Sequence, residues 1–225
     1  MRTMKKHNAN TQISESFRLS ALLSISGGLQ DAYTYNIRGK VFANGQTGNV
    51  VLMSQNFMSG DFKRGVYYLC PLVAFALGVF VTERIENRFK ESKGMHWRQM
   101  IILVEMVVLA IVGFLPTEVN LLANVLVSFS CAMQVQAFRK VHGYGYASTM
   151  CIGNLRSGTE SLSQYLRSKD REALRKALHF FGIILIFAIG AGLGGVLSGI
   201  LGIRTIWISV AILLIVTLMM AKKDA

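Results

Sequence analysis

Charged side chains are scarce in this chain of 225 residues: they make up 16% of the sequence, against about 25% in typical soluble domains. Apolar residues reach 52%, and the mean hydropathy is positive, at +0.42. A soluble domain of this length needs a charged surface around its core, so this composition argues against the ordinary soluble class. The lipid bilayer is therefore the expected surroundings of the chain.

The usual marks of catalytic and metal sites are also missing. The sequence has no HExxH, no GxSxG and no phosphate-binding glycine loop, the motifs that would indicate a metalloprotease, a serine hydrolase or an ATPase. Its three cysteines, Cys70, Cys131 and Cys151, show no paired spacing and are typical of small core residues. We expect no catalytic residue, metal or cofactor, and an enzyme is disfavoured.

The 24 Lys and Arg residues outnumber the 12 Asp and Glu residues, which gives a formal net charge of +12. Basic residues collect beside transmembrane helices on the cytoplasmic side, so this excess needs no nucleic-acid partner. No zinc spacing and no array of aromatic and basic residues indicates one either. Nucleic acid is not expected to bind.

Six apolar segments approach the length of about 20 residues that a membrane-spanning helix needs. The longest, after Lys176 and before Arg204, contains no Lys, Arg, Asp or Glu. The short connections near Pro116 to Glu118 and near Gly202 predict two tight helical hairpins. The six segments run roughly over Phe17 to Tyr35, Val66 to Thr82, Gln99 to Leu115, Val119 to Phe138, Ala177 to Ile203 and Thr205 to Ala221.

The distribution of Lys and Arg predicts the orientation of these spans. With six crossings and a cytoplasmic amino terminus, the inside segments hold nineteen Lys and Arg and the outside loops hold five. A model with eight crossings reduces this contrast to about fourteen against ten, and the positive-inside rule therefore favours six. We expect a multi-pass protein with both termini in the cytoplasm.

Two long segments between spans, residues 36–65 and 139–176, each contain a short stretch typical of a half-helix or re-entrant helix with a polar seam. Asp31 lies eighteen residues before Asn49, and Gln136 lies eighteen residues before Asn154. This offset predicts a duplicated unit of span, half-helix, span and span, with the first copy at about 17–115 and the second at about 119–221.

A unit with three crossings reverses the side from which the next copy enters the membrane. The sequence therefore predicts an inverted 3+3 repeat within a single all-α transmembrane helix bundle that covers residues 1–225. Many secondary transporters have this organisation, and their binding sites lie where the repeats meet.

The runs Gly28-Leu29-Gln30-Asp31-Ala32, Phe42-Ala43-Asn44 and Thr47-Gly48-Asn49 resemble the signature of the YoaK family, a group of small bacterial membrane proteins defined as a domain of unknown function. The similarity covers nearly the whole chain, including Gln136 and Gly153-Asn154. It implies a six- or seven-helix protein of the bacterial inner membrane and implies no chemistry. Ile152 stands in the second copy where the first has Thr47.

Two acids lie within predicted spans, where a charge costs about 2.5 to 3.5 kcal/mol at the bilayer centre. Asp31 is a candidate ligand for a proton, a cation or a cationic substrate group, and its alternatives are an acid at the membrane interface or a cap for the following half-helix. Glu105 is a second candidate, and its alternatives are an acid near the inner headgroups or a partner for a basic residue.

Five uncharged polar residues complete the candidate binding site. Asn49 and Asn154 each follow a glycine near the start of a predicted half-helix, where free backbone N–H groups attract anions. Thr47 is a candidate ligand or helix cap, while Gln134 and Gln136 either contact substrate or bond across helices.

The leading hypothesis is a small secondary transporter or permease for a small solute or ion, with alternating access between the two repeats. A noncatalytic membrane scaffold or regulator is the alternative, and a lipid-active enzyme is a weaker one. Glycines spaced by four between 190 and 199 predict a close helix partner, either within the chain or in a second copy, which makes a homo-oligomer an option.

Overall fold

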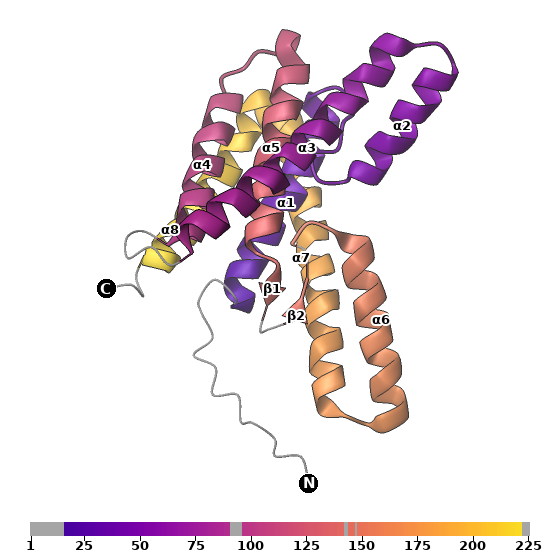
Figure 1. The fold of residues 1–225 in the computed structure, drawn as a ribbon, viewed down its shortest axis with the longest axis vertical. Coiled ribbons are helices and arrows are strands. Elements are labelled where there is room, and N and C mark those ends of the chain that lie inside the picture. The colour runs from indigo at the N-terminus through magenta and orange to yellow at the C-terminus, as the bar shows by residue number, and fades with distance from the viewer. Residues whose placement is uncertain (1–15, 91–95, 142–143, 147, 222–225) are drawn as a thin grey trace.

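In a computed structural model, which describes residues 16–90, 96–141, 144–146 and 148–221, the chain folds as a helical bundle (Figure 1). This confirms the all-α prediction. Within these residues the α-helices are α1 (Phe17–Ile37), α2 (Gln46–Met58), α3 (Phe62–Phe89), α4 (Trp97–Val112), α5 (Asn120–Ala137), α6 (Cys151–Ser168), α7 (Arg171–Leu201) and α8 (Ile206–Ala221). Short 3-10 turns, Thr117–Val119 and Gly202–Thr205, and a pair of two-residue strands, β1 (Lys140–Val141) and β2 (Tyr144–Gly145), complete it.

The helices of the first half pack in the same pattern as those of the second half. Helix α1 packs on α7, and α5 packs on α3. Likewise α2 packs on α3 while α6 packs on α7, and α4 packs on α5 while α8 packs on α1. Exchanging α1 to α4 for α5 to α8 therefore leaves these helix pairs unchanged. The inverted repeat itself stays a prediction.

Glycine allows α1 and α7 to approach very closely. A Cβ atom added at Gly190 would lie 2.3 Å from the carbonyl oxygen of Ile25, and one added at Gly28 would lie 2.2 Å from that of Phe187. On the other side of the bundle, Gly78 of α3 meets the backbone of Phe129 in the same way. The close partner predicted for the glycines of α7 is therefore α1 of the same chain.

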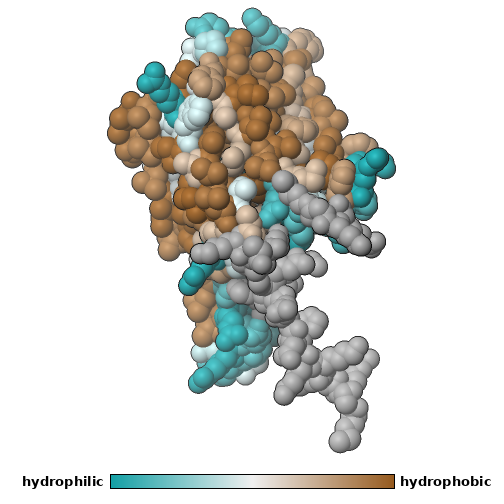
Figure 2. Space-filling model, turned by 90° about the vertical axis from the view of Figure 1, so that its left-hand side faces the viewer, coloured by the Kyte–Doolittle hydropathy of each residue, from teal (hydrophilic) through white to brown (hydrophobic). Residues whose placement is uncertain are grey.

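A broad hydrophobic surface lies on the side formed by α4 and α8, bounded by hydrophilic groups above and below (Figure 2). Three helical stretches in the described residues are long and apolar enough to cross a membrane: Phe62–Phe89, Thr117–Ala137 and the 51 residues Arg171–Ala221, which contain both α7 and α8. At 16 residues, α4 is shorter than the 20 or so that a perpendicular crossing needs. The count of six spans stays a prediction.

The two predicted half-helices form as α2, of 13 residues, and α6, of 18 residues. Both begin near the centre of the molecule and run away from it in different directions, α2 beside α3 and α6 beside α7 (Figure 1). Few of their residues are buried: Asn49 in α2, and Asn154, Gly158 and Ser161 in α6. The cations at residues 2, 5, 6, 222 and 223, on which the predicted orientation partly rests, lie outside the described residues.

Candidate functional site

Polar side chains fill the interior of the bundle beside the middle of α1. The amide of Gln30 donates to the Ser26 hydroxyl at 3.0 Å and to Oε1 of Glu105, from α4, at 3.2 Å. The Oε1 atom of Gln30 accepts from the thiol of Cys131, from α5, at 2.7 Å. We name the set of Ser26, Gln30, Asp31, Asn44, Glu105 and Cys131 the central polar cluster, since Asp31 and Asn44 lie beside Cys131. Three helices and the turn before α2 contribute to it.

Glu105 has no solvent exposure, and its Oε2 atom has no hydrogen-bond partner among the described residues. No salt bridge of the described residues includes it. A buried carboxyl group with an unsatisfied oxygen is costly to keep and is therefore a candidate functional group. The alternatives of an acid near the headgroups or an ion-pair partner do not describe its surroundings.

Asp31 is also buried, and its carboxylate faces the turn before α2. Its Oδ1 atom accepts from the backbone N–H of Asn44 at 2.7 Å, and the N–H groups of Ala43 and Gly45 also point toward the carboxylate. The side-chain amide of Asn44 donates a hydrogen bond to the carbonyl oxygen of Gly27 at 3.3 Å. Asp31 thus stabilises this turn against α1, but it does not cap α2.

Asn49 supports the same turn from the other side. Its amide donates to the carbonyl oxygen of Phe42 at 2.7 Å, and its Oδ1 atom accepts from the Phe42 N–H at 3.3 Å. The structure therefore links Asn49 to Asp31 through residues 42–44. Thr47 is exposed, and the capping role expected for it is wrong, because Gly45 is the N-cap residue of α2 and no side chain caps this helix.

The candidate residues of the second half lie near the start of α6. Gln134 is buried, and its amide donates to the hydroxyl of Ser148 at 3.2 Å. Gln136 and Asn154 line a cavity of about 390 Å³ between the end of α5, the β1–β2 hairpin and α6. Tyr146 lines the same cavity, and burial raises the pKa of its hydroxyl well above the usual range. Gln136 and Asn154 are thus brought together, away from the Asp31 carboxylate.

The two turns that precede α2 and α6 meet on one residue of α1. Gly27 accepts a hydrogen bond from the Asn44 amide, and the methyl group of Thr149 occupies the space where a Cβ atom of Gly27 would lie. Cys151, the first residue of α6, lies within electrostatic range of Asp31. The amino-terminal ends of both short helices therefore reach the region of the central polar cluster.

Sequence reasoning did not single out Gln30, Cys131 or Arg38 as site residues. Gln30 lies within the motif that carries the family resemblance, so its position was a usable signal. Arg38 is wholly buried at the end of α1 and donates to the carbonyl oxygens of Val112 and Leu115, at 2.9 and 2.8 Å. Nothing in the sequence around Arg38 indicates partners that lie more than 70 positions later.

No group of three or more His, Cys, Asp and Glu side chains that could hold a metal ion occurs in the part of the chain that the structure describes. The central polar cluster offers carboxyl and amide oxygens together with one thiol. Such a set can bind a proton, a cation or a small polar molecule, and it contains no paired nucleophile and base.

Comparisons with known proteins agree with a membrane protein. The chain is 26% identical over 182 residues to "UPF0700 transmembrane protein YoaK" of Bacillus subtilis (strain 168). The aligned residues cover 77% of this chain and 80% of that protein. No solved structure matches this chain significantly. The family model described as "Protein of unknown function (DUF1275)" matches residues 19–219, nearly the whole described bundle. The chain therefore belongs to the DUF1275 family, which includes proteins similar to YoaK.

Proposed function

We propose that this protein is a small secondary transporter or permease of the bacterial plasma membrane, with both termini in the cytoplasm. The observation that carries the proposal is the meeting of the turns before α2 and α6 at Gly27, beside the central polar cluster. Short helices from two halves that start at a shared buried polar region are typical of transporter binding sites. The exchangeable packing of the two halves supports the same reading.

Within this proposal Glu105 is the stronger candidate for the coupling ion. The carboxylate of Asp31 is already occupied by backbone N–H groups of the turn, whereas Oε2 of Glu105 has no donor among the described residues. Glu105 would bind a proton or a cation, with Gln30 holding its other oxygen. Asp31 and Asn49 would keep the turn before α2 in place. The position of this turn would then depend on what Glu105 binds.

The solute would reach the cluster along the start of α6. The cavity of about 390 Å³ lies there, and Gln136, Asn154 and Tyr146 supply polar groups to it. Its volume falls within the range of about 300 to 1,000 Å³ that is usual for small-molecule sites. Rocking of one half against the other would alternate the exposure of this path.

Uptake measurements on proteoliposomes test the proposal. A thermal-shift screen of purified protein first selects a solute that stabilises it, because a ligand of the native state raises its stability by mass action. Uptake of that solute is expected to fall by about tenfold or more in Glu105→Gln and in Asp31→Asn. The first change removes the ionisable group that binds the coupling ion, and the second weakens the turn before α2. Glu160→Gln, which neutralises an exposed acid on α6, is the matched control and retains uptake.

Normal uptake in both acid variants, with equal amounts of folded protein in the vesicles, would overturn the assignment. The scaffold or regulator hypothesis has one observation in its favour: Asp31 and Asn49 both make hydrogen bonds that stabilise a turn. It predicts that a double variant, Asp31→Asn with Asn49→Ser, assembles and leaves the phenotype unchanged. It also predicts that no solute is taken up by the wild-type protein.

A further inference from the structure

The first outside loop carries an unusual number of cations. Residues 36–65 contain Arg38, Lys40, Lys63 and Arg64, which are four of the five Lys and Arg residues predicted outside. Loops that cross to the outer side of a membrane generally contain few Lys and Arg residues, so the cations of this loop need a separate explanation. Arg38 is internal and holds the end of α4, but Lys63 and Arg64 lie in the first turn of α3 and line a cavity.

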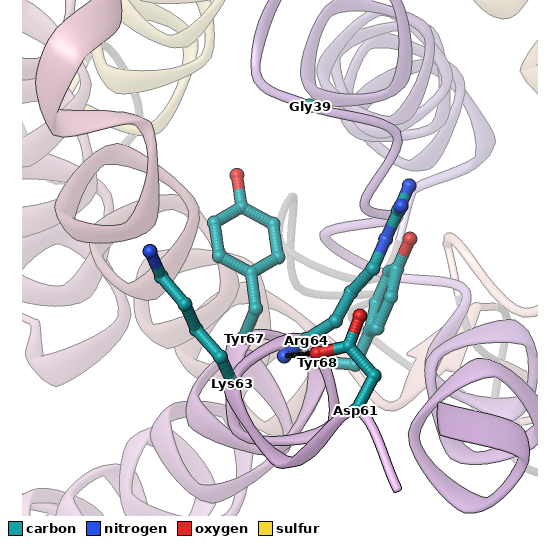
Figure 3. A pocket seen from close by; sticks show the side chains of 6 residues that line it. All are labelled: Gly39, Asp61, Lys63, Arg64, Tyr67 and Tyr68. Carbon is teal, nitrogen blue, oxygen red and sulfur yellow. Dashed lines mark hydrogen bonds between the residues drawn. The ribbon is translucent and has the colours of Figure 1, made fainter. Parts of the chain in front are cut away.

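This outer cavity has a volume of about 340 Å³ and is lined by Gly39, Asp61, Lys63, Arg64, Tyr67 and Tyr68. Figure 3 shows the lining side chains of α3 extending toward the segment that carries Gly39, with Lys63 and Tyr67 on one side and Arg64 and Tyr68 on the other. Two cations and two phenol groups thus converge on one space. Its size suits a headgroup or a small anion.

The wall formed by Tyr67 is fixed before any ligand binds. Its hydroxyl donates to the carbonyl oxygen of Arg38 at 2.9 Å and accepts from the amide of Asn124 at 3.3 Å. Gly39 has a φ of +86°, and a Cβ atom there would lie 2.5 Å from the same hydroxyl. A glycine is needed at this position for both reasons. The wall of the outer cavity formed by Tyr67 and Gly39 is therefore preorganised, while Lys63 and Arg64 are exposed at its rim.

Tyr68 provides an independent sign that a ligand belongs in this space. Only 3% of the residue is exposed, yet its hydroxyl forms no hydrogen bond with the described residues. The hydroxyl opens onto the outer cavity, so an oxygen of a ligand bound there can accept its hydrogen bond.

The charge of the outer cavity selects an anion. Neither Lys63 nor Arg64 forms a salt bridge with a carboxylate of the described residues. The single acid of the lining, Asp61, accepts from the backbone N–H of Arg64 at 3.0 Å and caps α3. Guanidinium, ammonium and phenol donors together match the several oxygens of a phosphate group.

We propose that the outer cavity is a binding site for a phosphate-bearing anion. Beside it, Met58 and Phe62 are 90% and 67% exposed, as expected for side chains that contact lipid. The phosphate therefore belongs either to an anionic lipid headgroup or to a soluble phosphate. The site shares no lining residue with the cavity at α6 and does not depend on the proposed transport activity.

Thermal unfolding of the full-length protein in a nonionic detergent tests this site, with two probes: short-chain phosphatidylglycerol and inorganic phosphate, each against chloride at equal ionic strength. The double variant Lys63→Gln/Arg64→Gln is expected to weaken the binding of the effective probe by about a hundredfold, and Tyr68→Phe by about tenfold. Arg84→Gln, at the far end of α3, removes one positive charge outside the cavity and is the control that retains binding.

Stabilisation by the lipid alone identifies a headgroup site, and stabilisation by both probes identifies a site for phosphate itself. Either outcome supports the proposal if it is lost in the double variant and kept in Arg84→Gln. The proposal is overturned if neither probe stabilises the wild-type protein more than chloride does. It is also overturned if the double variant and Tyr68→Phe respond as the wild type does.

Discussion

Replacing Gly190 by alanine is expected to lower the melting temperature of the protein markedly. The added methyl group would lie 2.3 Å from the carbonyl oxygen of Ile25, so α7 and α1 would have to separate along their contact. Overpacking of this kind costs about 1 to 3 kcal/mol, and we expect the upper end because the obstacle is backbone. For a chain of this size, the cost corresponds to about 2 to 4 °C for each kcal/mol.

Gly192→Ala is the matched control, because this position lies two residues later on α7 and a Cβ atom there meets nothing within 4 Å. The better helix propensity of alanine, about 1 kcal/mol, should leave its melting temperature unchanged or raise it. Thermal unfolding of both variants in one detergent, followed by intrinsic fluorescence, provides the comparison. Equal changes in the two variants would contradict the close contact between α1 and α7.

Arg38→Met is expected to destabilise the fold by at least about 3 kcal/mol, because five hydrogen bonds from one buried guanidinium are lost and the Leu115 carbonyl oxygen loses this donor. The guanidinium has no exposed surface, and methionine would fill much of the same volume without replacing its hydrogen bonds. Those bonds join α1 to the α4–α5 connection. The acceptors are the Tyr33 hydroxyl at 2.7 Å, the Asn120 side chain at 3.2 Å and the carbonyl oxygens of Val112, Leu115 and Pro116 at 2.9, 2.8 and 3.1 Å.

Lys40→Met, two residues further on, removes an exposed cation and should change stability little. Arg38→Lys tests geometry, since lysine keeps the charge but cannot reach acceptors in several directions at once. We expect it to resemble Arg38→Met in melting temperature and in the yield of monodisperse protein. If Arg38→Met unfolded at the wild-type temperature, the hydrogen bonds of Arg38 would not be holding α1 to the α4–α5 connection.

The positions of the long helices could be predicted from hydrophobic runs, and the start of α1 at Phe17 agrees, but the beginnings of α3 and α7 could not. Helix α7 starts at Arg171, several residues before the predicted start at Ala177, because Asp170 caps it and a charged first segment continues the helix. Helix α3 starts at Phe62 rather than Val66, since Asp61 caps it. Caps in polar segments extend a helix beyond the apolar residues that reveal it.

The candidate site was predicted in its members more than in its arrangement. Motif spacing pointed to Asp31 and Asn49, which do meet through one turn. The contact between Gln30 and Glu105 joins residues 75 positions apart, and no periodicity within one helix can reveal it. Long-range pairing of this kind depends on how helices pack, which local patterns do not encode.

The packing of α1 has a consequence for biosynthesis. Its main partners are α7 and α8, which leave the ribosome last, so α1 has to wait in the membrane while most of the chain is translated. During that interval the side of α1 that packs on α7, which includes Gly28, Leu29 and Ala32, lacks its partner helix. Chains that stop before residue 171 should therefore be preferred targets for membrane quality-control proteases, even though they already contain the six helices α1 to α6.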